Sequence, residues 1–155
     1  MDLKPDTQTP LSQVLATKGR GKATLSVPPD ISVAAAVDVL NQNQVGSVLV
    51  LDGGRLVGIF TERDILRRVV GERRDPAATK VSDVMTRDLV VMRPSASVVD
   101  AMRVVSEKRI RHIPVVEAGN VVGVVSQGDL NHWLVRNREG QIQDLVDYVT
   151  GKYPA

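Results

Sequence analysis

A hydroxyl residue followed three positions later by an aspartate occurs twice, and both pairs could bind a phosphorylated sugar. The pairs are Thr61 with Asp64 and Ser126 with Asp129. At the start of a helix such a pair can form a capping box, in which the two side chains bond free backbone N–H groups. The same helix start attracts a phosphate through its unpaired N–H groups and its dipole, while the carboxylate can accept hydrogen bonds from both ribose hydroxyls. The spacing alone leaves both interpretations open.

The residues inside the two motifs differ, so the two predicted sites should not be equivalent. Arg63 lies in the first helical turn of the first copy, where its charge opposes the helix dipole. A bound phosphate would explain this arginine, and the alternative is a solvated surface side chain. The second copy has Gly128 in its place, and glycine costs about 1 kcal/mol relative to alanine in a helix. Close approach of a ligand to the backbone would explain that glycine, whereas a helix cap would not require it.

Further basic residues lie near the motifs. Arg111 and His112 take the places of Gly46 and Ser47 in the second copy, and we expect them to supply the positive charge of the second site. For His112 the alternative is a partly buried histidine with satisfied hydrogen bonds. Residues 18–22 form a basic, glycine-containing loop that does not match the phosphate-loop pattern, although its charge could lie near a bound phosphate.

The motifs recur because a longer segment of the chain is duplicated. Adding 65 to the residue number carries residues 58–65 onto residues 123–130, with glycine, two apolar residues, a hydroxyl residue, two variable positions, aspartate and an aliphatic residue in the same order. The same offset needs no gap over residues 27–69. A duplicated supersecondary unit therefore organises the chain, and its repeated polar residues are where function is expected.

Each copy has the pattern of a β-α-β-β-α unit. Apolar residues spaced by three and four indicate helices, and continuous apolar runs rich in β-branched residues indicate buried strands. Ser32 or Asp30 can cap the first long helix, residues 52–55 have the composition of a hairpin turn, and Gly71 ends the helix before it. The predicted strands are residues 24–27, 45–51, 56–60, 113–116 and 121–125, and the predicted helices are 11–15, 31–43, 61–70, 81–85, 97–108, 127–137 and 141–149.

Neither unit is expected to be stable alone, because its sheet leaves one face uncovered. Two units can cover these faces as a pseudo-twofold pair with one cleft beside each repeat. The fold class is therefore α+β, with two β-α-β-β-α repeats and small sheets packed against helices. The predicted organisation is a flexible N-terminus (1–10), a first repeat with its lead-in helix (11–71), a linker (72–80), a second repeat (81–138) and a C-terminal helix and tail (139–155).

Composition argues against several classes of function. The 155 residues carry a net charge of +2 and include no cysteine, which excludes disulfides and thiolate metal sites. We find no secretory signal and no apolar run of roughly 18 residues, so we expect a cytoplasmic protein without membrane contact. One Phe, one Trp and two Tyr cannot form a stacking platform for single-stranded nucleic acid. His112 and His132 lack the spacing of zinc ligands, and no nucleophile motif is met, so we do not expect an enzyme.

Together these features make the chain resemble the tandem CBS (cystathionine-β-synthase) domain, or Bateman module. The resemblance rests on both repeated motifs, on VSDVMT at residues 81–86 and on RHIPVVE at residues 111–117, and it spans roughly residues 11–138. Residues 141–151 are similar to the ending of small stand-alone bacterial CBS-pair proteins. The family implies binding of an adenosine nucleotide in clefts between the repeats: AMP foremost, with ADP, ATP, NAD(H) or S-adenosylmethionine as alternatives. It also implies regulation and not catalysis.

The resemblance also implies positions for individual residues. Ala36 and Ala101 would be small residues beside an adenine, Val45 and Ile110 would line its other side, and the segment before each middle strand would lie against the adenine or the phosphates. The complete predicted site is Thr61, Arg63, Asp64, Ser126, Asp129, Val45, Gly46, Ser47, Ile110, Arg111, His112, Pro114, Ala36 and Ala101.

We therefore expect a regulatory module whose ligand biases the relative angle of the repeats, which an unidentified partner protein could read. A ligand shifts such an equilibrium only by its differential affinity for the two states. A homodimer is the expected assembly. The alternative, from another class of function, is a scaffold with empty clefts whose helices mediate oligomerisation or partner docking.

Overall fold

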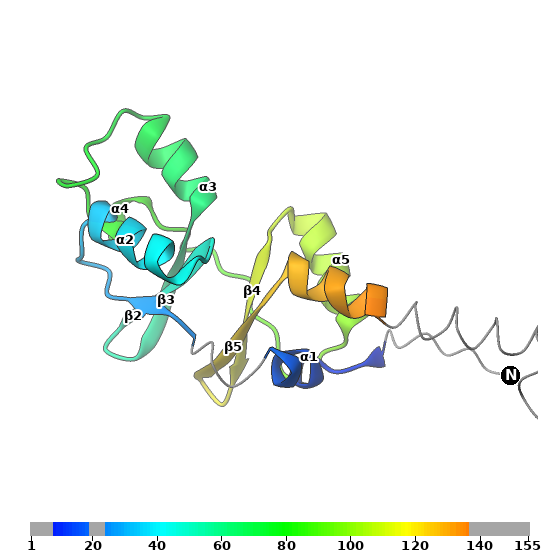
Figure 1. Cartoon of the computed structure of the whole chain (residues 1–155). Helices are drawn as coiled ribbons and strands as arrows, with labels where there is room; N and C mark the ends of the chain where they lie inside the picture. The colour runs from blue at the N-terminus through cyan, green and yellow to red at the C-terminus, as the bar shows by residue number, and fades with distance from the viewer. Residues whose placement is uncertain (1–7, 19–23, 137–155) are drawn as a thin grey trace, which may run out of the picture.

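The computed structural model describes residues 8–18 and 24–136. Figure 1 shows two units side by side, each a small sheet with helices against it. Residues 1–7 of the predicted flexible N-terminus and the predicted helix at 141–149 lie outside the described residues. The elements are α1 (Leu11–Thr17), β1 (Ser26–Val27), α2 (Val33–Asn43), β2 (Ser47–Asp52), β3 (Arg55–Thr61), α3 (Glu62–Asp64), η2 (Ile65–Val70), α4 (Val81–Val84), α5 (Val98–Lys108), β4 (His112–Glu117), β5 (Asn120–Ser126) and a helix over residues 127–136.

The first repeat has a three-stranded sheet in which β1 runs parallel to β2 and β2 runs antiparallel to β3. α2 begins at the predicted N-cap Ser32, whose hydroxyl accepts a hydrogen bond of 3.1 Å from Ala35 N. Gly53 and Gly54 form the predicted hairpin turn with φ values of 56° and 84°. Glycine adopts such positive φ angles without strain, and this turn therefore fixes the register of the hairpin.

The second repeat follows the same plan with one reduction. β4 and β5 form an antiparallel pair with the register of β2 and β3. The third strand expected from the duplication is a single parallel bridge between Met92 and Val115. These two residues are the equivalents of Val27 and Val50, which pair in the first repeat. The topology is therefore repeated, although the third segment of the second sheet forms only one bridge and not a strand.

The helix after β3 is not the plain α-helix that was predicted for residues 61–70. It begins with one turn of α3 and continues as the π-helix η2, in which Gly71 N donates to Leu66 O at 2.8 Å. Gly71 itself has φ −60°, so it is not the left-handed cap that a terminal glycine often provides. A Cβ there would lie 2.7 Å from Arg67 O. A glycine is required because the wide turn of the π-helix brings the backbone carbonyls of Leu66 and Arg67 close to residue 71.

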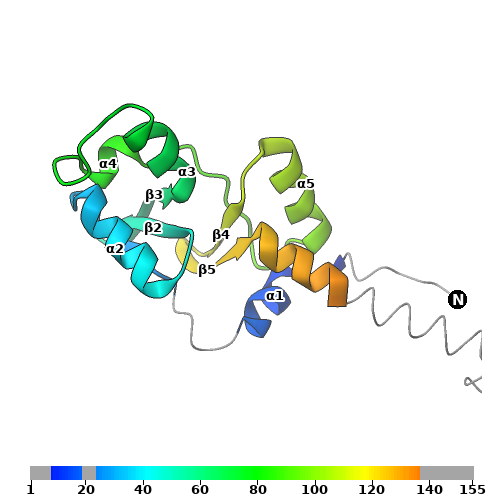
Figure 2. The same cartoon turned by 45° about the horizontal axis from the view of Figure 1, so that its top comes forward.

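The short helices α1 and α4 each pack on the repeat to which they do not belong in chain order, as Figures 1 and 2 show. Leu11 and Val14 of α1 are buried in the core of the second repeat, whereas Val81 and Val84 of α4 are buried in the core of the first. This packing crosses the predicted division into residues 11–71 and 81–138. Neither core is complete without the lead-in helix of the other repeat.

Equivalent backbone hydrogen bonds hold the two exchanged helices. Leu11 N donates to Ala96 O at 2.8 Å, and Val81 N donates to Ile31 O at 2.9 Å. Ala96 and Ile31 are related by the offset of 65. The two lead-in helices are thus exchanged in an equivalent way, which agrees with the predicted pseudo-twofold pair although the exchange itself was not predicted.

The repeated glycines Gly58 and Gly123 are explained by this exchange. A Cβ on Gly58 would lie 2.5 Å from Met85 Sδ, and a Cβ on Gly123 would lie 2.7 Å from Leu15 Cδ2. Met85 and Leu15 come from the ends of α4 and α1. The glycines therefore let each lead-in helix approach the last strand of the other repeat. None of the helices within residues 8–18 and 24–136 has the length and apolar character that a bilayer span needs.

Candidate functional site

Two clefts lie between the repeats, one beside each predicted aspartate. The Asp64 cleft has a volume of about 440 Å³ and the Asp129 cleft about 680 Å³, both within the range of roughly 300–1,000 Å³ typical of small-molecule sites. Described residues that line the Asp64 cleft are Gly46, Ile59, Thr61, Glu62, Arg63, Asp64, Leu66, Arg67, Thr86, Asp88, Leu89, Val90, Ile110, Arg111, His112 and Pro114. Those that line the Asp129 cleft are Leu15, Lys18, Thr24, Leu25, Gln42, Asn43, Val45, Gly46, Ser47, Leu49, His112, Val122, Gly123, Val124, Ser126 and Asp129.

Asp64 is buried and caps its own helix. Its Oδ2 accepts hydrogen bonds from Thr61 N at 3.0 Å and from Thr61 Oγ1 at 3.2 Å, and Asp64 N donates to Thr61 Oγ1 at 3.3 Å. This is the predicted capping box. Asp64 Oδ1 accepts a hydrogen bond of 2.9 Å from Thr86 Oγ1, with Arg68 Nη1 at 3.8 Å. A carboxylate has about four acceptor positions, so most of the capacity of Asp64 is already used.

Asp129 also caps its helix, but its second oxygen has no hydrogen-bond partner among the described residues. Ser126 N donates to Asp129 Oδ2 at 2.7 Å, and Asp129 N donates to Ser126 Oγ at 3.0 Å. Lys18 Nζ forms an ion pair with the same Oδ2 at 2.5 Å, while Oδ1 accepts no hydrogen bond from any described residue. Burial raises the pKa of Asp129, but the hydrogen bonds from Lys18 and Ser126 outweigh it and hold the pKa below its usual value. The group is therefore ionised at neutral pH.

The two aspartates consequently differ in the hydrogen-bond acceptor positions that they leave for a ligand. A ribose diol brings two hydroxyl donors, which need two acceptor positions on one carboxylate. Asp129 keeps one oxygen free on a side chain that is 22% exposed, whereas the side chain of Asp64 is 6% exposed and would have to exchange Thr86 for a ligand hydroxyl. The Asp129 cleft is the better fit for a ribose. The Asp64 cleft is richer in arginine, with Arg63, Arg67 and Arg111 among its lining residues.

The segment before β4 lies at the opposite cleft from the one predicted. Arg111 lines the Asp64 cleft and not the Asp129 cleft, and His112 lines both. The prediction that Arg111 supplies positive charge beside Asp129 is wrong, because each cleft takes its strand-entry segment from the other repeat. The cation beside Asp129 is instead Lys18, the first residue of the basic segment 18–22, whose charge was noted only as one that could lie near a phosphate.

The remaining strand-entry residues follow the same crossed rule. Val45 and Ser47 line the Asp129 cleft, Ile110 and Pro114 line the Asp64 cleft, and Gly46 lines both. A Cβ on Gly46 would lie 3.3 Å from Glu62 Cδ. The predicted wall residues are therefore brought to the clefts, each opposite the aspartate of the other repeat.

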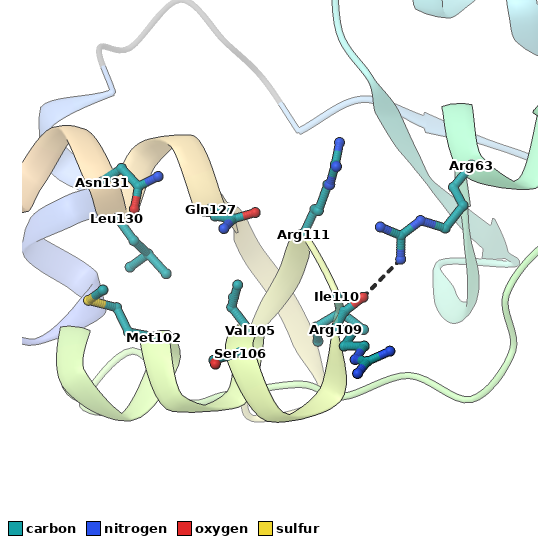
Figure 3. Close-up of a pocket in the computed structure, with 10 residues that line it drawn as sticks. All are labelled: Arg63, Met102, Val105, Ser106, Arg109, Ile110, Arg111, Gln127, Leu130 and Asn131. Atoms are coloured by element: carbon teal, nitrogen blue, oxygen red, sulfur yellow. Dashed lines mark hydrogen bonds between the residues drawn. The ribbon is translucent and has the colours of Figure 1, made fainter.

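Arg63 has a role that neither interpretation of the sequence included. Its Nη1 donates a hydrogen bond of 2.8 Å to Arg109 O, so it links the first repeat to the end of α5 in the second (Figure 3). It also lines the Asp64 cleft. A guanidinium has further donors that remain available to an anion.

Three residues interpreted as ligand-facing lie elsewhere. Ala36 and Ala101 are 0% exposed in the cores of the first and second repeat, and they line neither cleft. Their small size serves helix packing against the sheets, so we leave them out of the site. Gly128 also lines neither cleft, and a Cβ there would meet only Ser126 Oγ at 3.6 Å. No packing contact of the described residues therefore requires a glycine at this position.

Several lining residues were missed in the sequence. Thr86, which bonds Asp64, follows α4 within the segment that was noted only for its family resemblance. Leu89 and Val90 line the Asp64 cleft, and their equivalents by the offset of 65, Thr24 and Leu25, line the Asp129 cleft. The duplication could have revealed them, because residues at equivalent positions of the two repeats line equivalent clefts. Once one of the two segments is placed at a cleft, the other is expected at the second cleft.

His112 stands between the two clefts. Burial lowers the pKa of His112 most, and the positive charge of Lys18 lowers it further, while Asp129 and Glu62 partly oppose this effect. The imidazole is therefore neutral at pH 7 and can both donate and accept a hydrogen bond. Within the described part of the chain, no three His, Asp or Glu side chains gather as metal ligands would.

Comparisons with known proteins agree with this architecture. The sequence profile of the CBS domain matches residues 22–71 and 81–136. A mitochondrial CBS domain-containing protein of Arabidopsis thaliana is 36% identical over 94% of this chain and 74% of its own length. The crystal structure of a CBS-domain containing protein from Agrobacterium tumefaciens aligns with a TM-score of 0.75 at 34% identity, over 80% of this chain and 98% of that one. A CBS domain pair crystallised with 5′-methylthioadenosine and S-adenosyl-L-methionine aligns with a TM-score of 0.69 at 23% identity, over 81% of this chain and 94% of that one.

Proposed function

This chain belongs to the CBS-domain family as a tandem pair, and from this premise we propose that it is a regulatory module that binds an adenine nucleotide between its repeats. The observation that carries the proposal is the arrangement around Asp129. An ionised carboxylate with a free oxygen borders a cleft of about 680 Å³, beside the cation of Lys18. Such a pairing suits a ligand that joins a ribose diol to a negatively charged group.

The walls of the Asp129 cleft support an adenine ring as the remaining part of the ligand. Leu25, Val45 and Val124 provide apolar surface, while Ser47 provides a polar group. A small-molecule site of this kind combines a mainly apolar lining with a few placed polar groups. No Phe, Tyr or Trp lines either cleft within the described chain, so the base would be held mainly by aliphatic contacts.

The identity of the nucleotide is a finer part of the proposal. AMP is our first candidate, followed by ADP, ATP, NAD(H) and S-adenosylmethionine. The CBS pair crystallised with two adenosine-containing ligands shows that this fold can bind adenosine. At 23% identity it is similar to this chain in fold only, so it does not indicate which ligand this chain binds. The crossed lining of the clefts supports a signalling role, because a ligand there touches both repeats and would bias their relative angle.

Calorimetry on the wild type and on Asp129→Asn and Asp64→Asn tests the proposal. We expect AMP to bind with a dissociation constant near micromolar, which corresponds to about −8 kcal/mol. Asp129→Asn should weaken binding at least tenfold, and Asp64→Asn should weaken it less, because Asp64 is already bonded to Thr61 and Thr86. Unchanged affinity in both variants would remove the ribose role of these residues.

A second candidate function is a docking scaffold, and two observations favour it. The carboxylate of Asp64 is occupied by intramolecular bonds. Leu66 and Val70 on η2 are 66% and 62% exposed and lie one helical turn apart. Such apolar side chains would suit the contact between two copies, which is our proposed homodimer. Sedimentation equilibrium of the wild type and of Val70→Lys tests this contact, and a monomeric wild type would overturn it.

Thermal melting separates the two functions. A nucleotide that binds the native state must raise the melting temperature, whereas a scaffold with empty clefts shows no shift. We propose no catalytic activity, since the sequence meets no nucleophile motif and no three His, Asp or Glu side chains of the described residues gather as metal ligands would. The cytoplasmic location stays a prediction, because one relative is mitochondrial.

A further inference from the structure

A third cavity, which shares Arg63, Ile110 and Arg111 with the Asp64 cleft, lies between α5 and the helix over residues 127–136 (Figure 3). Its volume is about 330 Å³. Val105 and Leu130, which are 7% and 1% exposed, form an apolar floor. Ser106 and Gln127 add a hydroxyl and an amide to the wall. The cavity can therefore hold a small group and offer it neutral hydrogen-bond donors.

Three arginines line this cavity, and no acidic residue is among its described lining residues. They are Arg63, Arg109 and Arg111, and Figure 3 shows them at one end of the cavity. In the described chain, none of the three guanidinium groups lies within ion-pair distance of a carboxylate. Three arginines at one cavity stand out in a chain whose net charge is +2, although Arg63 and Arg111 also adjoin the acidic residues of the Asp64 cleft. A concave wall of one sign concentrates positive potential.

A hydrogen bond between the repeats holds one of these charges, that of Arg63, in place. Arg109 ends α5 in the left-handed conformation, with φ 53°, and its carbonyl accepts the hydrogen bond of 2.8 Å from Arg63 Nη1. This bond brings a first-repeat guanidinium to a second-repeat cavity. It uses the backbone of Arg109, so the side chain of Arg109 is left for other contacts.

The cluster is not a by-product of the duplication. The residues equivalent to Arg109 and Arg111 in the first repeat are Gln44 and Gly46, and Gly128 takes the place of Arg63 in the second repeat. The charge therefore arises only where the unlike residues of the two copies meet. A purely structural requirement of the repeated unit would place similar residues in both.

We propose that this arginine pocket binds a polyphosphate group, with Arg109 as its principal side-chain contact. Planar guanidinium groups pair with phosphate oxygens in a bidentate manner, and several of them are needed for a di- or triphosphate. The site does not depend on the proposed nucleotide function. Arg63 and Arg111 also line the Asp64 cleft, so the polyphosphate can be free or can be the tail of a nucleotide seated there.

Titration calorimetry with pyrophosphate, ATP and adenosine on the full chain tests the proposal. The variant is Arg109→Asn, because asparagine tolerates the left-handed backbone and keeps the carbonyl that Arg63 bonds. The matched control is Arg103→Gln, which removes an exposed arginine from α5 that does not line the pocket. Circular dichroism and the melting temperature of each variant verify the fold.

If the pocket binds a free polyphosphate, Arg109→Asn should weaken pyrophosphate binding at least tenfold, and Arg103→Gln should bind it like the wild type. If the pocket binds the phosphate tail of a nucleotide, Arg109→Asn should weaken ATP binding at least tenfold and leave the affinity for adenosine unchanged. The proposal is overturned if Arg109→Asn alters neither, or if Arg103→Gln weakens binding equally. Adenosine binding of the wild type is a separate readout, so its absence would count against the nucleotide function and not against the arginine pocket.

Discussion

Lys18 Nζ lies 2.5 Å from Asp129 Oδ2 and donates a hydrogen bond of 2.7 Å to Val124 O, so one ammonium joins β5 to the helix that follows it. When the lead-in helices are aligned so that Leu15 corresponds to Met85, the position equivalent to Lys18 is Asp88, which lines the Asp64 cleft. There the last strand, β3, is instead joined by backbone hydrogen bonds between Ile59 and Thr86, at 3.0 and 2.9 Å. The two clefts share one fold, but a lysine side chain contacts the last strand at the Asp129 cleft, whereas backbone hydrogen bonds do so at the Asp64 cleft.

Replacing Lys18 by methionine should raise the pKa of Asp129 toward its ordinary value, since its hydrogen-bonded cation is lost. The lowered pKa of Asp129 contributes stability above its unfolded value and loses it as the pH falls through the folded value. At pH 7 we expect Lys18→Met to cost about 1 kcal/mol, the order of a partly exposed ion pair with a hydrogen bond. Urea denaturation at several pH values should show a constant difference from the wild type above about pH 5, which narrows as the pH falls through 3.8, the ordinary pKa of the group.

The control for this series is Lys80→Met, which removes an exposed lysine whose side chain has no ion pair among the described residues. It should be close to the wild type at every pH. A difference between Lys18→Met and wild type that stays constant across the acid range would show that the ion pair with Asp129 does not form in solution.

The exchange of lead-in helices predicts a crossed effect of two equivalent substitutions. Val14 of α1 and Val84 of α4 are 2% and 1% exposed in opposite cores. Each replacement by alanine should cost about 2 kcal/mol through lost apolar burial and the cavity left behind. Hydrogen exchange should show Val14→Ala loosening β4 and β5, and Val84→Ala loosening β2 and β3. The reverse pattern would contradict the exchange and favour packing in chain order.

Much of this fold could be predicted because duplication doubles every local signal. The hairpin at Gly53 and the caps at Ser32, Thr61 and Ser126 depend on neighbours in sequence, and the structure has these four features. The exchange of α1 and α4 could not be predicted in this way. It depends on contacts between residues far apart in the chain, and a short apolar helix fits either core.

The site shows the same division between local and distant causes. The capping boxes and their place at clefts follow from local motifs, whereas the partner of each aspartate does not. Arg111 was assigned to the wrong cleft because its position in the repeat does not reveal which strand it faces. The π-helix after Asp64 also has no local sequence signal, since residues 65–70 have an ordinary helical pattern.

Three glycine-to-alanine substitutions should have effects of different sign. Gly58→Ala places a Cβ 2.5 Å from Met85 Sδ and 3.0 Å from Thr86 O, so we expect a loss of about 1–3 kcal/mol from overpacking. Gly123→Ala meets only the end of the Leu15 side chain, which can rotate, and should cost less. Gly128→Ala has open space and should gain up to about 1 kcal/mol through helix propensity. Chemical denaturation measures all three, and a neutral Gly58→Ala would contradict the close packing of α4 on β3.

The pH dependence of nucleotide binding should report on His112, which lines both clefts. Burial and the nearby Lys18 lower the pKa of His112 in the free protein, so the imidazole is neutral at pH 7 and its protonation below about 6.5 costs stability. A bound phosphate would oppose both effects and raise that pKa, and binding must then take up protons. We therefore expect AMP affinity to rise as the pH falls from 8 to 6.5, a window above the second pKa of phosphate near 6. Calorimetry in buffers of different ionisation enthalpy measures this uptake as a fraction of one proton, and His112→Asn should abolish it. Adenosine, which lacks the phosphate, is the matched control, and an equal pH dependence of adenosine and AMP would show that the phosphate does not lie near His112.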